Sequence, residues 1–204
     1  MGRTSMEMSE ILPGRLYLGS MHVARDCELL GRVGVTHVVD ASNQVSARKF
    51  TVSSSGRPIV YLDVDEEDSD DTDLQKHFES VCSFVERAWQ EEAGRVLIHC
   101  VAGVSRSATL AMYCVMRLEG VSLRAAHDLV RRQRPLVRPS AAFAQQLVAA
   151  ERELRGDNSC GLEDMQLRRS MDQFASSSGS KEKKSRPAAA LEGLAGNSTG
   201  CCLL

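Results

Sequence analysis

The sequence predicts an α/β domain in which a central, mixed and mostly parallel sheet is flanked by helices. Two observations carry this prediction. Short apolar, β-branched runs alternate with longer segments of helical periodicity along residues 5–155, and strands separated by helices are typical of sheets covered on both faces. Apolar residues make up 43% and charged residues 25% of the 204 residues, which is the balance of a chain with a packed core.

Four short segments have the composition of buried strands, because each is rich in apolar or β-branched residues and is bounded by polar or turn residues. In chain order they are Leu16–Gly19, Thr36–Asp40, Ile59–Asp63 and Arg95–His99.

Two segments are expected to be long helices in the middle of the chain. Apolar residues recur at helical spacing from Leu74 to Trp89, which is typical of an amphipathic helix. A second helix is predicted from Arg106 to Glu119, where Gly120 stops it.

Two further helices are predicted after Gly120. Ser122 is the N-cap of the first, which ends before Pro135 because proline disfavours helical backbone at the preceding residue. The last helix follows Pro139 with Ser140 as its N-cap. It is expected to bury the apolar side chains of Phe143, Leu147 and Leu154.

The composition changes near residue 156. The predicted domain spans residues 1–155, and residues 156–204 form a low-complexity tail rich in Ser, Gly, Ala and charge. Such a segment buries too little apolar surface to offset its ordering entropy, so we expect a flexible tail, with one short helix around Leu167, Met171 and Phe174.

Charge and cysteine usage exclude several classes of protein. A net charge of −2 gives no basic field for a nucleic-acid partner. The N-terminus has no apolar signal segment, so we expect a cytoplasmic or nuclear protein whose seven cysteines are thiols. They form no C-x-x-C pair, and we expect neither a metal site nor a cofactor.

Residues 99–107, His-Cys-Val-Ala-Gly-Val-Ser-Arg-Ser, lie between a predicted strand and a predicted helix. Backbone N–H groups converge in such a turn, and the helix dipole adds positive potential, so the turn favours both a phosphate and a thiolate. Cys100 is therefore the candidate nucleophile.

Three other residues of this loop fit the same chemistry. The planar fork of Arg106 can bind two phosphoryl oxygens, and Gly103 permits a tight turn. Ser107 can hydrogen-bond the cysteine sulfur and improve it as a leaving group. The alternative is a structural loop, because chance alone is expected to place an arginine six residues after a cysteine about once in a chain of this composition.

The loop resembles the signature loop of the cysteine-dependent protein phosphatases, in the form found in the small atypical dual-specificity phosphatases. Residues 12–20, 34–40 and 134–147 are also similar to segments of that family, in the same order. The resemblance implies a protein tyrosine phosphatase-like fold over residues 1–155 and hydrolysis of phosphotyrosine and phosphoserine or phosphothreonine in protein substrates. The reaction would pass through a phosphocysteine intermediate.

The resemblance also implies a general acid, an aspartate on a loop just before a helix. Asp68 matches that position, and Asp65, Asp70 and Asp71 are close alternatives in the same acidic loop. The phosphate would be held by Arg106 and by the main-chain amides of the signature loop, contributed by Val101, Ala102, Gly103, Val104, Ser105 and Arg106.

Four residues outside the acid and the nucleophile are candidates for supporting roles. His99 is expected to be buried and to hydrogen-bond the loop. Ser140 stands where the family commonly has an asparagine that braces the loop, and Ser140 is expected to cap the following helix. Arg134 and Arg138 lie in a basic stretch. They either reach a second substrate phosphate or form a solvated helix end stabilised by the dipole.

Two other functions stay open on the same scaffold. One is an inositol-lipid or RNA 5′-phosphate phosphatase, and the other is a phosphoprotein-binding module without turnover. Relatives that act on highly charged substrates carry lysines in the loop. Val101, Ala102 and Val104 are apolar, which favours a protein monophosphate.

The last four residues, Cys-Cys-Leu-Leu, fit a prenylation motif with Cys201 as the acceptor and Cys202 as a second candidate lipid site. Basic residues between 181 and 186 supply a second membrane signal. We therefore expect a membrane-associated fraction if Cys201 is prenylated. The sequence leaves the oligomeric state open.

Overall fold

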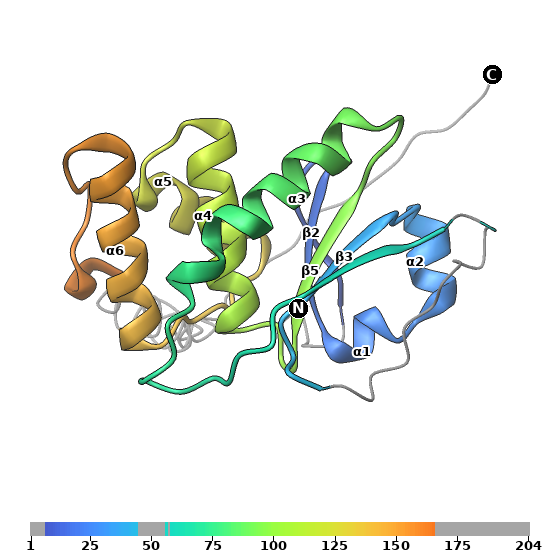
Figure 1. The fold of residues 1–204 in the computed structure, drawn as a ribbon, viewed down its shortest axis with the longest axis horizontal. Helices are drawn as coiled ribbons and strands as arrows, with labels where there is room; N and C mark the ends of the chain where they lie inside the picture. Colours follow the sequence, from blue (N-terminus) through green and yellow to red (C-terminus); the bar gives the residue numbers. More distant parts are fainter. Residues whose placement is uncertain (1–6, 45–55, 57, 166–204) are drawn as a thin grey trace, which may run out of the picture.

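The computed structural model describes residues 7–44, 56 and 58–165, and a mixed five-stranded sheet lies at its centre (Figure 1). The first strand is antiparallel to the second, and the remaining pairs are parallel. The predicted α/β fold with a mostly parallel sheet is therefore confirmed. The strand order across the sheet is β1 (Ser9–Leu12), β2 (Leu16–Ser20), β5 (Val96–Cys100), β3 (His37–Asp40) and β4 (Val60–Asp63).

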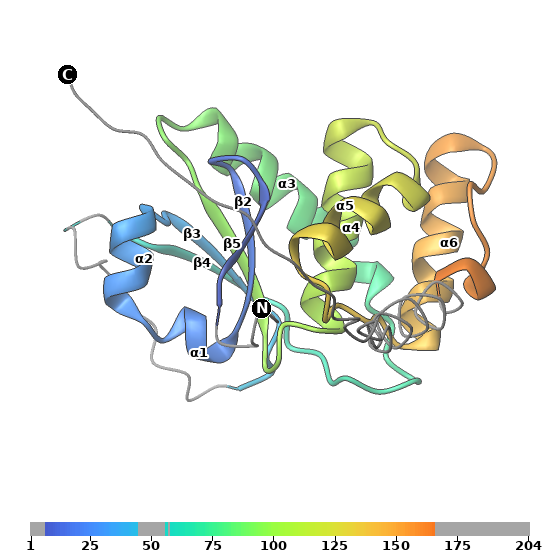
Figure 2. The same cartoon turned by 180° about the vertical axis from the view of Figure 1, so that it is seen from behind.

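Helices cover both faces of the sheet (Figures 1 and 2). Alternate residues of β5 face opposite layers, as the two-residue period of a strand requires. Leu97 packs with the smaller layer, whereas Val96 and Ile98 pack with the larger one. The smaller layer holds α1 (Met21–Ala24) and α2 (Cys27–Val33). The larger layer holds α3 (Phe78–Gln90), α4 (Arg106–Glu119), α5 (Leu123–Gln133) and α6 (Ala141–Arg155).

The central strand β5 carries the candidate nucleophile to one edge of the sheet. All five of its residues are buried, and it pairs with β2 on one side and β3 on the other. Its last residue, Cys100, lies beside Ser20 of β2, and His99 lies beside Asp40 of β3. The carboxyl ends of parallel strands meet at one edge, which is where α/β folds commonly place their sites.

Most helix ends lie where the sequence predicts them. Ser122 Oγ accepts from the N–H of Ala125 at 3.3 Å and caps α5, while Ser140 Oγ accepts from the N–H of Phe143 at 3.2 Å and caps α6. Gly120 follows α4 with a left-handed φ of 65°. The helix expected from Leu74 begins as a 3-10 turn over Gln75–His77 and continues as α3.

The expected burial of Leu154 is wrong, because this side chain is 39% exposed. Glu151 takes the inward position on α6 instead and is fully buried. Its carboxylate accepts from the N–H of Leu123 at 2.7 Å and from the N–H of Ser159 at 2.8 Å. The inward face of α6 is therefore set partly by a buried carboxylate that caps a neighbouring helix, a role that hydrophobic periodicity cannot reveal.

The packed core reaches beyond residue 155, where the domain was expected to end. Cys160 and Met165 are buried in the main core cluster, so the segment after α6 packs back on the domain. The predicted helix near Leu167 and the lipidation candidates Cys201 and Cys202 lie outside the described residues. The cysteines within the described part are free thiols, and none of the helices described combines the length and apolar character that crossing a membrane requires.

Candidate active site

The sulfur of Cys100 accepts hydrogen bonds from two donors at the end of β5. Cys100 is 2% exposed, and its Sγ accepts from the N–H of Gly103 at 3.3 Å and from the hydroxyl of Ser107 at 3.1 Å. Donors of this kind stabilise a negative sulfur more than a neutral thiol. The structure thus brings together Cys100, Gly103 and Ser107, as the sequence predicts.

The loop after Cys100 depends on the glycine at position 103. Its φ is 71°, a left-handed conformation that favours glycine. A Cβ at this position would lie 2.5 Å from the carbonyl oxygen of Gly19 and 2.7 Å from Nη2 of Arg134. No other residue type fits without moving the loop, and the loop then runs directly into the N-terminus of α4.

Arg106, the first residue of α4, connects this loop to the acidic loop of residues 63–73. It is 6% exposed, and its Nη1 donates to the carbonyl oxygen of Glu66 at 2.9 Å. Its Nε lies 3.5 Å from Oδ2 of Asp68. Residues of the acidic loop therefore hold the guanidinium close to the N-terminus of α4, where an oxyanion would bind.

Asp68 is the candidate acid that the structure places against the signature loop. Its Oδ1 accepts from the hydroxyl of Ser105 at 2.8 Å, and its side chain is 38% exposed. Asp65 and Asp71 line a separate acidic hollow of about 510 Å³, and Asp70 is exposed. This placement favours Asp68 over the three alternatives, and its partial exposure leaves it accessible to a leaving group.

The acidic loop is fastened to the helices at two points that the sequence did not reveal. Gln146 of α6 donates from Nε2 to the carbonyl oxygen of Thr72 at 2.7 Å. Its Oε1 accepts from the N–H groups of Leu74 and Gln75 at 2.8 and 2.9 Å. The loop that carries Asp68 is therefore braced by a helix far along the chain.

The second fastening is an ionic cluster on Glu66. Its carboxylate lies 2.9 Å from Nε2 of His77 and 2.5 Å from Nζ of Lys76. The hydrogen bonds from His77 and Lys76 lower the pKa of Glu66 below its ordinary value. Because Arg106 donates to the main-chain carbonyl of the same residue, this cluster also fixes the group that holds the Arg106 side chain.

Arg134 is a site residue whose role the sequence analysis did not identify. It is fully buried, so neither a second substrate phosphate nor a solvated helix end describes it. Its Nε donates to the carbonyl oxygen of Gly103 at 2.8 Å and its Nη2 to that of Ala102 at 3.3 Å. Its Nη1 donates to the carbonyl oxygen of Glu7 at 2.8 Å and to Ser9 Oγ at 3.3 Å.

These bonds orient the loop through the planarity of the peptide. The carbonyl of Ala102 and the N–H of Gly103 belong to one peptide unit and point in opposite directions. Arg134 holds that carbonyl on the far side, so the N–H turns toward Cys100 Sγ, as observed. Burial lowers the pKa of Arg134, while the nearby negative charges of Cys100 and Glu7 act in the opposite direction.

His99 is buried as expected, and its Nε2 lies 3.5 Å from Oδ1 of Asp40 on the neighbouring strand. Oδ1 of Asp40 also accepts from the N–H of Ser42 at 2.9 Å. Asp40 therefore places a carboxylate against the histidine that precedes Cys100.

The remaining supporting candidates act through the main chain and the helix cap. Ser140 caps α6, as predicted, and Arg138 donates its backbone N–H to the carbonyl oxygen of Val104 at 2.8 Å. The linker before α6 thus braces the signature loop without an asparagine side chain. Within residues 7–44, 56 and 58–165 no group of three His, Cys, Asp or Glu side chains is placed to hold a metal ion.

Residues 16–153 match the family model described as dual specificity phosphatase, catalytic domain. The chain belongs to this family. Dual specificity protein phosphatase 26 of Bos taurus is 38% identical to it over 146 residues, which are 72% of this chain and 68% of that protein.

Solved structures of this family share the fold. Human DUSP28 superposes with a TM-score of 0.65 at 32% identity, covering 72% of this chain and 95% of that one. A mouse putative dual specificity phosphatase complexed with zinc tungstate has a TM-score of 0.67 at 30% identity, covering 74% and 90%.

We expect Gly103→Ala to lower kcat/KM by about 10²-fold, because the added Cβ forces the loop away from Gly19 and misplaces the amides. Steady-state hydrolysis of p-nitrophenyl phosphate measures this. Gly156→Ala is the matched control, since Gly156 is also left-handed at 84° but has open space around it. Equal losses of activity in both variants would contradict the role given to the close approach.

We expect Arg134→Met to lower the free energy of unfolding by about 3 kcal/mol, because buried carbonyls lose their donors. Turnover is expected to fall as well, since the N–H of Gly103 is no longer oriented. Urea denaturation and p-nitrophenyl phosphate turnover measure the two effects, with the exposed Arg132→Met as control. Wild-type stability and turnover in Arg134→Met would disprove this role.

The ionic cluster on Glu66 is expected to give a pH-dependent contribution to stability. Because its pKa is lowered in the folded state, the contribution is present above the ordinary glutamate pKa and is lost as pH falls through the folded-state pKa. Glu66→Gln is therefore expected to be less stable than wild type at neutral pH, with the difference shrinking towards about pH 3. Urea denaturation across this range tests it, and a constant difference would contradict it.

Proposed function

We infer that this chain is a dual specificity protein phosphatase, which hydrolyses phosphotyrosine and phosphoserine or phosphothreonine in protein substrates. Family membership and relatives described as protein phosphatases support this activity. The observation that carries the chemistry is the pair of donors on Cys100 Sγ, near the buried side chain of Arg106 and the accessible carboxyl of Asp68.

In the first step, we propose that the thiolate of Cys100 attacks phosphorus. A sulfur–phosphorus bond forms while the bond from phosphorus to the substrate oxygen breaks. Asp68 gives its proton to the departing oxygen, which makes it a neutral alcohol or phenol. Arg106 and the loop amides hold the other phosphoryl oxygens, whose charge persists through a loose transition state.

In the second step, a water molecule attacks the phosphocysteine. Asp68, now a carboxylate, takes a proton from this water, and the sulfur–phosphorus bond breaks to release phosphate. The departing sulfur regains its negative charge within reach of the Ser107 hydroxyl and the Gly103 N–H. Both donors were already in place, so little reorganisation accompanies this charge.

The relatives do not favour the two alternatives considered from the sequence. The names of the relatives describe protein phosphatases and not inositol-lipid or RNA phosphatases. The mouse structure was solved with zinc tungstate, and tungstate is a tetrahedral oxyanion like phosphate. Lipidation of Cys201 or Cys202, a membrane-associated fraction, and a cytoplasmic or nuclear location stay predictions.

The general acid is tested with leaving groups of different basicity. We expect Asp68→Asn to lower turnover of a phosphoserine peptide by about 10²- to 10⁴-fold, because an alkoxide departs poorly without a proton. The loss on p-nitrophenyl phosphate is expected to be much smaller, since nitrophenolate is a good leaving group. Steady-state kinetics on both substrates measure the difference.

Two variants make this experiment decisive. Cys100→Ser is expected to abolish turnover of both substrates, and wild-type protein without turnover would disprove the enzyme function. Asp70→Asn makes the same charge change in the same loop. A leaving-group-dependent loss in Asp70→Asn, with full activity in Asp68→Asn, would assign the acid to Asp70 instead.

A further inference from the structure

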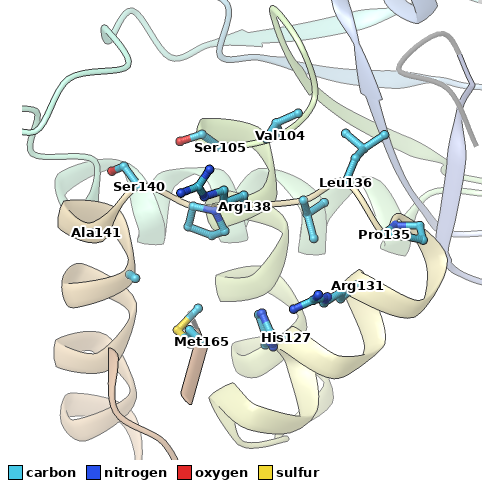
Figure 3. Close-up of a pocket in the computed structure, with 13 residues that line it drawn as sticks. Val104, Ser105, His127, Arg131, Pro135, Leu136, Arg138, Ser140, Ala141 and Met165 are labelled. Atoms are coloured by element: carbon cyan, nitrogen blue, oxygen red, sulfur yellow. The ribbon is translucent and has the colours of Figure 1, made fainter. Parts of the chain in front are cut away.

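A cavity of about 740 Å³ lies beside the signature loop and is separate from the pair of donors on Cys100 Sγ (Figure 3). It is enclosed by the loop itself, by α5, by the linker to α6 and by the first turns of α6. Met165, from the packed segment after α6, closes its far end. This volume is typical of a ligand site, and it can take a short stretch of extended peptide.

The cavity adjoins the active site at two residues of the loop. Val104 and Ser105 line it, and Ser105 also donates its hydroxyl to Asp68. The linker wall is fixed to the loop because the N–H of Arg138 bonds the carbonyl oxygen of Val104. A substrate segment that leaves Cys100 on the side of Val104 and Ser105 would meet this cavity.

The cavity is lined by apolar side chains and by two arginines. Its apolar part includes Pro135, Leu136, Ala144 and Met165. Arg131 extends into it from α5, and the side chain of Arg138 lies between Ser105 and Ser140 (Figure 3). None of the described residues that line it is acidic.

Arg138 is available to a ligand. Its side chain is exposed, and in the part of the chain that the structure describes no carboxylate pairs with it. The bond that holds it in place uses its backbone N–H alone. The guanidinium thus faces solvent at the edge of the active site, with a rigid attachment and no internal counterion.

The acidic loop of residues 63–73 has the reverse charge. There the hollow of about 510 Å³ is lined by Asp65, Glu66, Glu67, Asp71 and Asp73, with Lys76 as its one described cation. An acidic substrate residue would be repelled on that side and attracted on the side of the arginines.

We propose that the cavity binds the substrate segment next to the phosphorylated residue and that Arg138, supported by Arg131, selects a glutamate or aspartate in this segment. The proposal rests on the phosphatase function and adds the class of substrate to it. The apolar wall packs against the segment, while the arginines recognise its carboxylate.

The test uses phosphotyrosine peptides in which Glu, Gln or Lys is placed in turn at the near positions on each side. On one side of the phosphotyrosine, we expect kcat/KM of the full-length protein to be roughly two- to fivefold higher with Glu than with Gln. Higher ionic strength is expected to reduce this preference. Arg138→Glu is expected to reverse it, so that the Lys peptide becomes the better substrate.

Arg132→Glu is the matched control, since it makes the same charge change on an exposed residue of α5 that does not line the cavity. The preference for Glu is expected to survive in this variant. No preference at any position, or an equal change in Arg132→Glu, would overturn the proposal. A further peptide carries phosphoserine at the same position. A higher kcat/KM with phosphoserine but not with Glu would also overturn the proposal, because the cavity would then select a second phosphate.

Hydrolysis of p-nitrophenyl phosphate tests the phosphatase function apart from the cavity proposal, because this substrate has no peptide to occupy the cavity. Absence of its hydrolysis by the wild-type protein would reject the phosphatase function. Its hydrolysis together with equal use of the Glu, Gln and Lys peptides would reject the cavity proposal alone.

Discussion

The rest of the site depends on the hydrogen bonds that Arg134 donates to the carbonyl groups of Ala102 and Gly103. A peptide unit cannot turn its oxygen one way without turning its N–H the other way. By fixing the carbonyl of Ala102 behind the loop, the buried guanidinium orients the N–H of Gly103 toward the sulfur. A fully buried cation thereby positions a donor toward the sulfur of Cys100.

The fold brings together the other residues of the site, which lie on different segments of the chain. The central strand β5 brings Cys100 to the sheet edge, and α4 starts with Arg106 where the loop ends. Asp68 lies on a loop that two elements hold in place: the 3-10 turn Gln75–His77 binds Glu66, and α6 binds the loop through Gln146. The nucleophile and the acid therefore lie on separate segments, and their spacing depends on the contacts that hold the acidic loop as well as on the signature loop.

Local patterns predicted the parts of the site that are contiguous in sequence. The turn around Cys100, the caps at Ser122 and Ser140 and the stop at Gly120 each follow from a few neighbouring residues. Arg134 could not be identified, because its partners Gly103 and Glu7 are far away in the chain and a basic stretch suggests an exposed surface. The prediction that Leu154 is buried was wrong for a similar reason. Glu151 takes the buried position because it binds the N–H groups of Leu123 and Ser159, which come close to it only after folding.

The linker before α6 braces the signature loop through the backbone of Arg138 and not through its side chain. A backbone contact of this kind survives the exchange of one side chain for another. Position 138 can therefore diverge during evolution while the catalytic loop keeps its shape. Gene duplicates of such an enzyme could acquire new preferences by single substitutions at this residue, with little cost to the chemistry that they share.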